Sequence, residues 1–390
     1  MRITVGDRAV DFPQGTVWKD VAERFQGEYP REILLAKVGP RLYELHKRCP
    51  ERDMEAEFIT AGDKIGNMTY RRSAILMMLK AFFNVCEGVE GFDVIVEYSI
   101  GGGIYCHLKG DLSVTPELLD TVKETMRGYS ERKLPIMKHS VPTDEAIRFF
   151  RRVGMHSKEH LFRYRMTSRV NLYSLGNFED YFYGFMVMDC GYIRLFDLLP
   201  YNGGFVLLLP TETCPDALPP FRPMEKLFSV QKSWAEKVGI ANIGMLNDMI
   251  VQGETDHLIL MQEAIFEKTV GDIAAEISAQ DRKAVLIAGP SSSGKTSFSK
   301  RLAIQLQALG KKPHPISVDN YFINRALAPR DENGSYDFES IGSVDLPTFN
   351  RDMAALLREG KAWSCPAIIS LRESGSTREI SGSSPGMISL

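Results

Sequence analysis

Apolar and polar positions at the start of the chain follow the short periods of a small α+β module. The segments with strand character are residues 2–5, 8–12, 32–45 and 58–70. Gly6-Asp7, between the first two segments, is a hairpin turn signal. Residues 16–25 carry apolar positions at helical spacing, and Thr16 is the expected N-cap of that helix. The pattern predicts one folded module over residues 1–65.

A longer mixture of helical and strand patterns predicts an α+β region over residues 66–254. The predicted helices are residues 71–83, 115–130 and 144–165, and the predicted strands lie within residues 92–108 and 181–210. Thr115 and Pro116 are typical of a helix N-terminus, and Gly154 is expected to break the third helix. The glycines at 101–103 permit a turn or bulge between two strands. The proline-rich residues 213–223 are expected to form a connection.

The last third of the chain changes to an alternation of helix and strand. Residues 257–280 have a long amphipathic pattern, which predicts a linker helix over residues 255–282. An apolar run at 285–288, a helical pattern at 295–309 and an apolar run at 314–318 come next. Strand, helix and strand in this order indicate a parallel βαβ unit. An α/β domain is therefore expected over residues 283–390.

Composition and charge change this picture little. The 390 residues are 44% hydrophobic and 25% charged, and 47 Lys+Arg against 50 Asp+Glu leave a net charge of −3. That balance does not indicate a dedicated nucleic-acid binder. No apolar stretch reaches the roughly 20 residues of a membrane span, and the N-terminus has no apolar signal core. The six scattered cysteines are typical of free thiols. A cytoplasmic protein with no membrane partner is expected.

One motif carries a specific chemistry. Residues 289–296, GPSSSGKT, match G-x-x-x-x-G-K-[ST] without a gap. In such a loop the backbone N–H groups point at phosphate oxygens, and the following helix N-terminus adds partial positive charge. Lys295 is expected to reach the β and γ phosphates, and the Thr296 hydroxyl to bind Mg²⁺. The alternative is a Gly/Ser-rich turn without a ligand. The predicted ATP-binding residues are Gly289, Pro290, Ser291, Ser292, Ser293, Gly294, Lys295, Thr296 and Ser297.

Asp319 follows the second predicted strand of this unit. Ligands of open α/β sheets bind at the carboxyl ends of the strands, where Asp319 would lie. A carboxylate at that place can accept the proton of an attacking hydroxyl during phosphoryl transfer. The alternative is an aspartate that caps a helix.

Three segments of the last third resemble the uridine kinase family of P-loop nucleoside kinases. They are GPSSSGKTSFSKRL at 289–302, ISVDNYF at 316–322 and DENGSYDFESIGSVDL at 331–346. The resemblance implies that Asp319 is the base facing the ribose 5′-hydroxyl and that Lys295 stabilises the transferred charge. It implies that Asp337 holds the ribose hydroxyls, for which a solvated turn acid is the alternative. Tyr321 and Phe322 would shape the nucleoside pocket.

The N-terminal half resembles a different family. Residues 1–65, whose element order suggests a ubiquitin-like β-grasp fold, resemble the TGS module of threonyl-tRNA synthetases. Residues 66–254, around GMHSKEHLFRYR, resemble the second additional, editing-type domain of those synthetases. With the kinase segment, the chain is similar to bacterial uridine kinase-like proteins that carry a synthetase-like N-terminus. The implied fold is an α+β N-terminal half followed by an incomplete α/β P-loop kinase domain.

His156 and His160 have a spacing that can place two imidazoles on one helix face, where they can bind Zn²⁺. The synthetase editing domains pair this motif with a later Cys-x-x-x-His. Here Cys190 is followed four residues on by Arg194 instead. The two histidines are therefore either a relic metal site or polar surface residues.

Basic and aromatic residues interleave in the same region. Such a cluster can face RNA, and the alternative is a solvated helix face whose aromatic side chains turn into the core. The residues are Phe149, Phe150, Arg151, Arg152, Lys158, Phe162, Arg163, Tyr164, Arg165 and Arg169.

The kinase resemblance stops near Trp363. A doubly wound sheet needs about five strands, and residues 283–390 supply two plus a short apolar run, AIISL. Residues 363–390 are rich in Ser and Gly and are expected to be disordered. A truncated or frame-shifted kinase domain is the hypothesis that follows.

The sequence therefore predicts ATP-dependent phosphorylation of a nucleoside, uridine or cytidine, at its 5′-hydroxyl, impaired by truncation. The alternative is a nucleotide-binding protein that interacts with RNA or has a regulatory role, without kinase turnover. A nucleoside substrate, tRNA or RNA contact through the N-terminal half, and a homo-oligomer are the partners to be tested.

Overall fold

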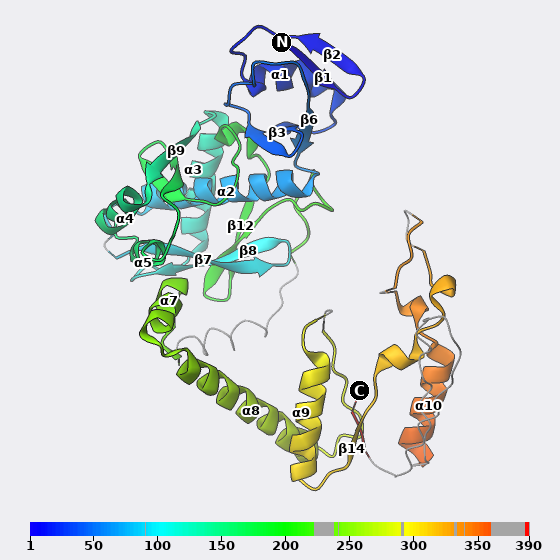
Figure 1. Ribbon diagram of the computed structural model, residues 1–390. Coiled ribbons are helices and arrows are strands. Elements are labelled where there is room, and N and C mark those ends of the chain that lie inside the picture. The colour runs from blue at the N-terminus through cyan, green and yellow to red at the C-terminus, as the bar shows by residue number, and fades with distance from the viewer. Residues whose placement is uncertain are drawn as a thin grey trace. The chain divides into compact units, whose positions relative to one another are not determined.

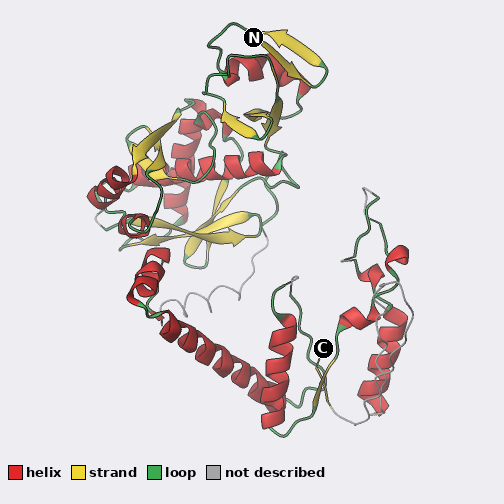
Figure 2. Ribbon diagram, viewed as in Figure 1, coloured by secondary structure: helices red, strands yellow, loops and turns green. Residues whose placement is uncertain are grey.

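The chain forms two compact units in a computed structural model, Met1–Gln252 and Gly253–Leu390. The described residues are 1–89, 91–221, 238–240, 242–289, 292–330, 334–338, 340–359 and 387–389. Helices and strands are mixed within the first unit (Figure 2). The expected α+β character of the N-terminal half is confirmed.

The N-terminal module has two small sheets around one helix. Its elements are β1 (Arg2–Val5), β2 (Arg8–Asp11), α1 (Trp18–Phe25), a 3₁₀ turn (Gln26–Glu28), β3 (Ile33–Val38), β4 (Arg41–Glu44), β5 (Met54–Glu55) and β6 (Glu57–Thr60). The strand orders are β2-β1-β5 and β4-β3-β6. The predicted hairpin is confirmed, since β1 and β2 pair antiparallel across a turn in which Gly6 has a φ of 56°. Trp18 and Phe25 of α1 are fully buried between the sheets.

Thr16 does not cap this helix as predicted. The helix begins after Val17, whose side chain makes no cap hydrogen bond. The Thr16 hydroxyl instead donates to the Pro13 carbonyl at 2.8 Å. Because the helix begins at Trp18, the N-cap position falls on Val17, one residue after Thr16, and a valine side chain has no acceptor for a helix N–H.

The rest of the first unit contains two further sheets and five helices in the described ranges. The helices are α2 (Lys64–Val85), α3 (Pro116–Glu131), α4 (Thr143–Arg152), α5 (His156–Phe162) and α7 (Ile243–Gln252). The strands are β7 (Asp93–Ile100), β8 (Gly103–Lys109), β9 (Ile136–Pro142), β10 (Arg169–Leu175), β11 (Phe178–Tyr181), β12 (Asp197–Tyr201) and β13 (Gly204–Leu208), with a 3₁₀ turn at Cys190–Tyr192. The predicted cap of α3 is confirmed, because the Thr115 hydroxyl accepts from the Leu118 N–H at 3.2 Å.

The larger sheet has the order β12-β13-β8-β7 and is antiparallel throughout. The predicted turn at Gly101-Gly102 and a bulge between Val96 and Tyr98 are both present. Figure 1 shows α2 running between the N-terminal module and this sheet. The smaller sheet, β11-β10-β9, packs against α4 and α5, and Gly154 separates these two helices as predicted.

One apolar core connects the module to the region that follows it. Leu34, Leu35 and Ile59 of the module are buried in the same cluster as Met77 of α2 and Phe205 of β13. A second cluster around Trp18 lies within the module itself. The module and the larger sheet are therefore packed together and not joined only by the chain.

The second unit has little regular sheet. Its elements are α8 (Thr255–Ala279), α9 (Lys295–Ala308), β14 (Pro313–Pro315), α10 (Leu346–Glu359) and β15 (Met387–Ser389), with 3₁₀ turns at Val318–Tyr321, Arg325–Leu327 and Ile341–Ser343. The linker helix and the helix after the phosphate loop are present as α8 and α9, which pack through a small core that includes Val270, Ala274 and Leu302. Apart from β15, the predicted disordered tail at 363–390 lies outside the described residues.

The two strands predicted around α9 are largely absent. Residues 285–288 form no strand, and the second strand is limited to Pro313–Pro315, which pairs in parallel with β15. Val285 and Ile287 pack against the α8–α9 core, whereas the Leu286 side chain between them is 77% exposed. The alternation typical of a strand is thus present, but no described residue supplies the hydrogen-bonded neighbour that a strand requires. A P-loop α/β domain is not formed by the described residues.

No described helix combines the length and the apolar composition needed to cross a bilayer.

Candidate functional site

A cavity of about 400 Å³ opens where the N-terminal module meets the rest of the first unit. We call it the junction cavity. It is lined by Leu42, Tyr43, Glu44, Lys47, Arg48, Lys138 and Phe185. Strand β4 and the loop after it supply one side, and β9 and the segment at 184–187 supply the other.

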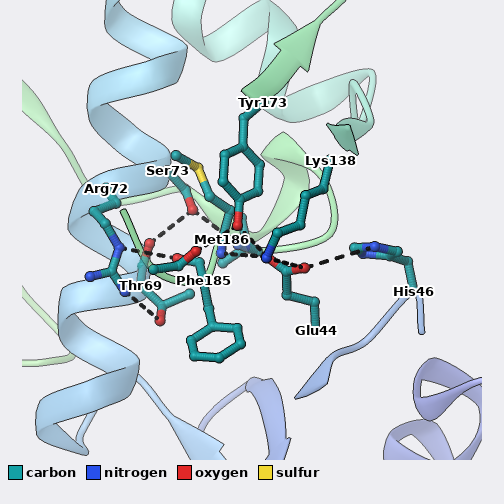
Figure 3. A network of polar contacts seen from close by, with 11 residues as sticks. Glu44, His46, Thr69, Arg72, Ser73, Lys138, Tyr173, Phe185 and Met186 are labelled. Carbon is teal, nitrogen blue, oxygen red and sulfur yellow. Dashed lines mark hydrogen bonds and ion pairs between the residues drawn. The ribbon is translucent and has the colours of Figure 1, made fainter. Parts of the chain in front are cut away.

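The carboxylate of Glu44 is the centre of a polar network at this junction (Figure 3). Its side chain is 2% exposed. It accepts hydrogen bonds from the Tyr173 hydroxyl at 2.7 Å, the Met186 N–H at 3.1 Å and the Lys138 ammonium at 3.3 Å. A buried carboxylate is tolerated only where donors replace its water, and these three groups do so. The pKa of the Tyr173 hydroxyl is raised, first by burial and then by the charge of Glu44.

Helix α2 fixes the segment that carries Met186. The Ser73 hydroxyl accepts from the Val187 N–H at 3.0 Å and donates to the Thr69 carbonyl at 2.8 Å. The Arg72 guanidinium donates to the Phe185 carbonyl at 3.1 Å, and burial lowers the pKa of that guanidinium. Figure 3 shows these contacts around the backbone of the segment that carries Phe185 and Met186. The backbone at the cavity wall is therefore held at three consecutive residues.

Three cations lie around the cavity, and they differ in their partners. The Lys138 ammonium lies 5.2 Å from the ring centre of Tyr173 and 5.4 Å from that of Phe185, so cation–π attraction adds to its pairing with Glu44. Lys47 and Arg48 are exposed, and their side chains make no ion pair or hydrogen bond with any described residue. Two positive charges at the rim are thus available to an anion.

The imidazole of His46 lies next to this network. Its Nε2 is 3.9 Å from the Glu44 carboxylate, and its buried Nδ1 has no hydrogen-bond partner among the described residues. Burial lowers the pKa of His46, and the nearby Glu44 charge opposes that effect.

The basic and aromatic cluster at 149–169 is mostly paired internally. Phe150 and Phe162 are buried in the core between α4, α5 and the smaller sheet. Arg151 and Arg163 both donate to the Glu159 carboxylate, at 2.9 and 3.0 Å, which lowers the pKa of Glu159 to about 2. The charges of this cluster hold the two helices together, and Phe150 and Phe162 turn inward, as the alternative interpretation expected.

His156 and His160 contact different acidic residues. His156 is exposed, and its Nδ1 is 3.3 Å from the Glu159 carboxylate. His160 pairs with Asp248 of α7, which also accepts from the Tyr164 hydroxyl. No group of three or more His, Cys, Asp or Glu side chains in the described ranges is arranged to hold a metal ion.

The thiol of Cys190 is fully buried. Its burial raises its pKa to about 12. Arg194, four residues on, donates to the Gly191 carbonyl at 2.9 Å. Neither side chain extends the histidine pair toward a metal site.

The phosphate-loop segment lies in the second unit at the start of α9. Gly294 is the residue before the helix and has a φ of 84°, and Ser292 has a φ of 60°. The Lys295 ammonium donates to the Gly289 carbonyl at 2.7 Å. Lys295, Thr296 and Ser297, the first residues of α9, are exposed. Pro290 and Ser291 lie outside the described residues.

The predicted nucleoside residues have mixed environments. Asp319 is exposed in a 3₁₀ turn, and Phe322 is 41% exposed. Tyr321 is 2% exposed and packs edge-on against Phe349 at 5.2 Å, so it is part of a small core. Asp337 accepts from the Ser340 N–H at 3.1 Å. Their roles toward a nucleoside stay predictions.

Sequence reasoning missed the junction cavity. Its network joins Glu44, Ser73, Lys138, Tyr173 and Met186, which are far apart in the chain. The one local signal was an acidic residue directly before the apolar Leu45 at the end of a strand pattern. That signal does not identify the partners.

No family model matches the chain. Among curated proteins it is similar to threonine–tRNA ligases. It is 28% identical over 209 residues to the threonine–tRNA ligase of Bacillus velezensis and 29% identical over 209 residues to threonine–tRNA ligase 1 of Bacillus subtilis. Each match covers 53% of this chain and 32% of the relative. The match to the threonine–tRNA ligase of Methylococcus capsulatus is 27% over 196 residues, covering 50% of this chain and 30% of the relative.

The chain thus matches about a third of the length of these relatives. The resemblance of about half the chain to threonyl-tRNA synthetases is confirmed, and it fits the α+β N-terminal region. The relatives are ligases. They contradict the expectation that the chain is a phosphotransferase acting on the 5′-hydroxyl of uridine or cytidine, and that prediction is wrong.

Proposed function

We propose that the unit Met1–Gln252 binds tRNA and that the chain acts as an RNA-interacting protein without kinase turnover. The observation that carries this proposal is the similarity of about half the chain to proteins named as tRNA ligases. The junction cavity supports it, because Lys47 and Arg48 offer charges that no described residue neutralises. This function implies a cytoplasmic location.

Contact with RNA needs cations that are exposed and unpaired. A lysine or arginine that already pairs with a carboxylate binds a phosphate with a smaller gain in free energy, because the existing ion pair must be broken first. Arg151 and Arg163 are engaged by Glu159, whereas Lys47 and Arg48 are not engaged. We therefore expect the phosphate backbone at the rim of the junction cavity and not at the Glu159 cluster.

Titration of the whole chain with tRNA at several salt concentrations tests this function. Removal of one cation that binds a phosphate should reduce the slope of log affinity against log salt by about 1, so Lys47→Ala/Arg48→Ala should reduce it by about 2. The double variant Lys268→Ala/Lys283→Ala changes the net charge equally, at exposed positions of the second unit, and should leave the slope unchanged. Absence of tRNA binding by the unaltered chain would refute the proposal.

We also propose that residues 289–297 bind ATP with Mg²⁺. The supporting observation is the left-handed backbone at Gly294 directly before α9, with Lys295 turned back over Gly289. The helix N-terminus and the lysine would neutralise phosphate charge, and Thr296 would be the Mg²⁺ ligand. The donors present fit a triphosphate, since a helix N-terminus, an ammonium and a hydroxyl are all at one helix end.

Isothermal calorimetry with Mg-ATP tests the second proposal. Lys295→Ala should abolish or strongly weaken the binding, whereas Lys300→Ala, about one and a half turns further along α9, should not. Equal binding by both variants would show that the loop is a plain turn.

A further inference from the structure

We infer that the junction cavity takes up one unpaired nucleotide of the bound RNA, with its phosphate at Lys47 and Arg48 and its base against Phe185. The inference deepens the proposed function and rests on it for the source of the nucleotide. A cavity of about 400 Å³ lies within the range of about 300–1,000 Å³ of sites for small organic ligands. A volume of this size can hold one nucleotide.

The lining combines the three kinds of group that a nucleotide needs. Leu42, Tyr43 and Phe185 give an apolar and aromatic wall on which a base can stack. Lys47 and Arg48 give exposed positive charge for a phosphate. An acidic peptide would use the cations but not the aromatic wall, and an apolar ligand would leave the cations unused.

Lys138 supplies the third kind of group, a hydrogen-bond donor beside the wall. Its side chain is 17% exposed, and its ammonium has three N–H donors. Glu44 accepts from this ammonium at 3.3 Å, and the Tyr173 and Phe185 rings hold it from their faces. We expect the remaining donors to pair with acceptor atoms of the base. Lys138 is thus fixed before the ligand arrives, which lowers the entropic cost of binding.

Hydrogen bonds also fix the backbone that carries Phe185 in the aromatic wall. Contacts from α2 fix the backbone of residues 185 and 187, and Glu44 fixes that of Met186. The Phe185 ring is carried by this fixed segment (Figure 3), and the Lys138 ammonium lies 5.4 Å from its centre. A ring carried on an anchored backbone is suited to stacking, because little freedom remains to be lost when the base binds.

The test compares three ligands on the full chain: a single-stranded RNA hexamer, a blunt RNA duplex and free nucleoside monophosphates. We expect the hexamer to bind more tightly than the duplex at equal salt. Phe185→Leu keeps an apolar side chain but removes the aromatic face, and it should weaken the hexamer about tenfold, the size of one lost base stack. The salt slope for the hexamer should not change, because no charge is removed.

Phe83→Leu is the matched control. Phe83 is an aromatic residue of α2 that is 44% exposed and does not line the cavity. Phe83→Leu should leave hexamer binding unchanged. Thermal melting of both variants verifies that they fold.

The outcomes separate this inference from the proposed function. If tRNA binds with the expected salt slope but Phe185→Leu has no effect on the hexamer, tRNA binding stands and the nucleotide pocket is overturned. If the monophosphates bind as tightly as the hexamer and compete with it, the pocket serves free nucleotides and the RNA source is overturned. If neither tRNA nor hexamer binds, both proposals fail.

Discussion

Glu44 and Glu159 are two nearly buried carboxylates that reach their partners in different ways. Glu44 is held by groups from three other parts of the first unit, whereas Glu159 is held by Arg163 on the following turn and Arg151 on the preceding helix. A residue of the first kind ties distant segments together. A residue of the second kind stabilises one helix pair.

Removal of the Glu44 carboxylate should cost stability in proportion to the donors it leaves behind. Glu44→Ala leaves the Met186 N–H and the Lys138 ammonium without their acceptor, which predicts a loss of about 2–3 kcal/mol in the free energy of unfolding. Urea unfolding monitored by circular dichroism measures it. Glu57→Ala is the control, because Glu57 is 71% exposed and pairs with Lys37 at the surface, which predicts a loss below about 1 kcal/mol. Equal losses in the two variants would contradict the structural role of Glu44.

Glu159 should make stability fall at low pH. Its pKa is held at about 2, first by Arg163 and then by Arg151, below an ordinary value of 4.5. A depressed pKa in the folded state gives stability that is complete above pH 4.5 and is lost as the pH falls toward 2. The difference in unfolding free energy between the unaltered chain and Glu159→Gln should therefore shrink over that interval. A difference that stays constant through the same acid titration would exclude this account.

At the scale of elements, α2 passes close to the end of β6 at Gly66. A Cβ at Gly66 would lie 1.8 Å from the Thr60 carbonyl oxygen, so only glycine fits there. Gly66→Ala should force the helix and the strand apart and cost about 3 kcal/mol in the free energy of unfolding. Chemical denaturation of the purified variant measures this loss.

Gly128 on α3 offers the matched substitution. The nearest atom to a Cβ at Gly128 is the end of the flexible Arg132 side chain, at 3.8 Å. Gly128→Ala should stabilise the chain by about 0.5–1 kcal/mol, because alanine is the better helix former. Destabilisation by both substitutions would mean that helix packing, not the single approach at Gly66, is the limiting factor.

The elements that the sequence predicts well are those whose signals are local. The β1–β2 hairpin depends on Gly6, and the start of α3 depends on Thr115 and Pro116, which are adjacent in the chain. Residues 285–288 have the alternation of a strand but lack a described partner, so a pattern alone did not produce the strand. Strand formation depends on a neighbour, and the local sequence does not contain that neighbour.

The difference between local and distant signals also explains why the sequence predicted the phosphate loop and not the junction cavity. The phosphate loop is one contiguous motif, so its residues are visible in the sequence, and its ligand remains a prediction. The junction cavity is assembled from β4, β9 and the segment at 184–187, which meet only after the unit has folded. Lys47 and Arg48 have no feature in the sequence that separates them from other surface cations; their lack of partners is a property of the fold.

At the scale of the whole molecule, the two proposed sites lie in different units and should be separable by mutation. Lys47→Ala/Arg48→Ala should weaken tRNA binding and leave the heat of Mg-ATP binding unchanged. Lys295→Ala should do the reverse. Both variants are measured with both ligands on the full chain, and loss of tRNA binding in Lys295→Ala would show that the nucleotide site contributes to RNA binding.

Leu34, Leu35 and Ile59 bury their side chains against α2 and not only within their own sheet. The first sixty residues thus cover the interior of the neighbouring region as much as they form a module of their own. A fragment that starts at α2 would present water-exposed apolar helix surface, and we expect it to be recovered as aggregates. A protein engineer who transfers the N-terminal module to another protein would therefore have to include α2.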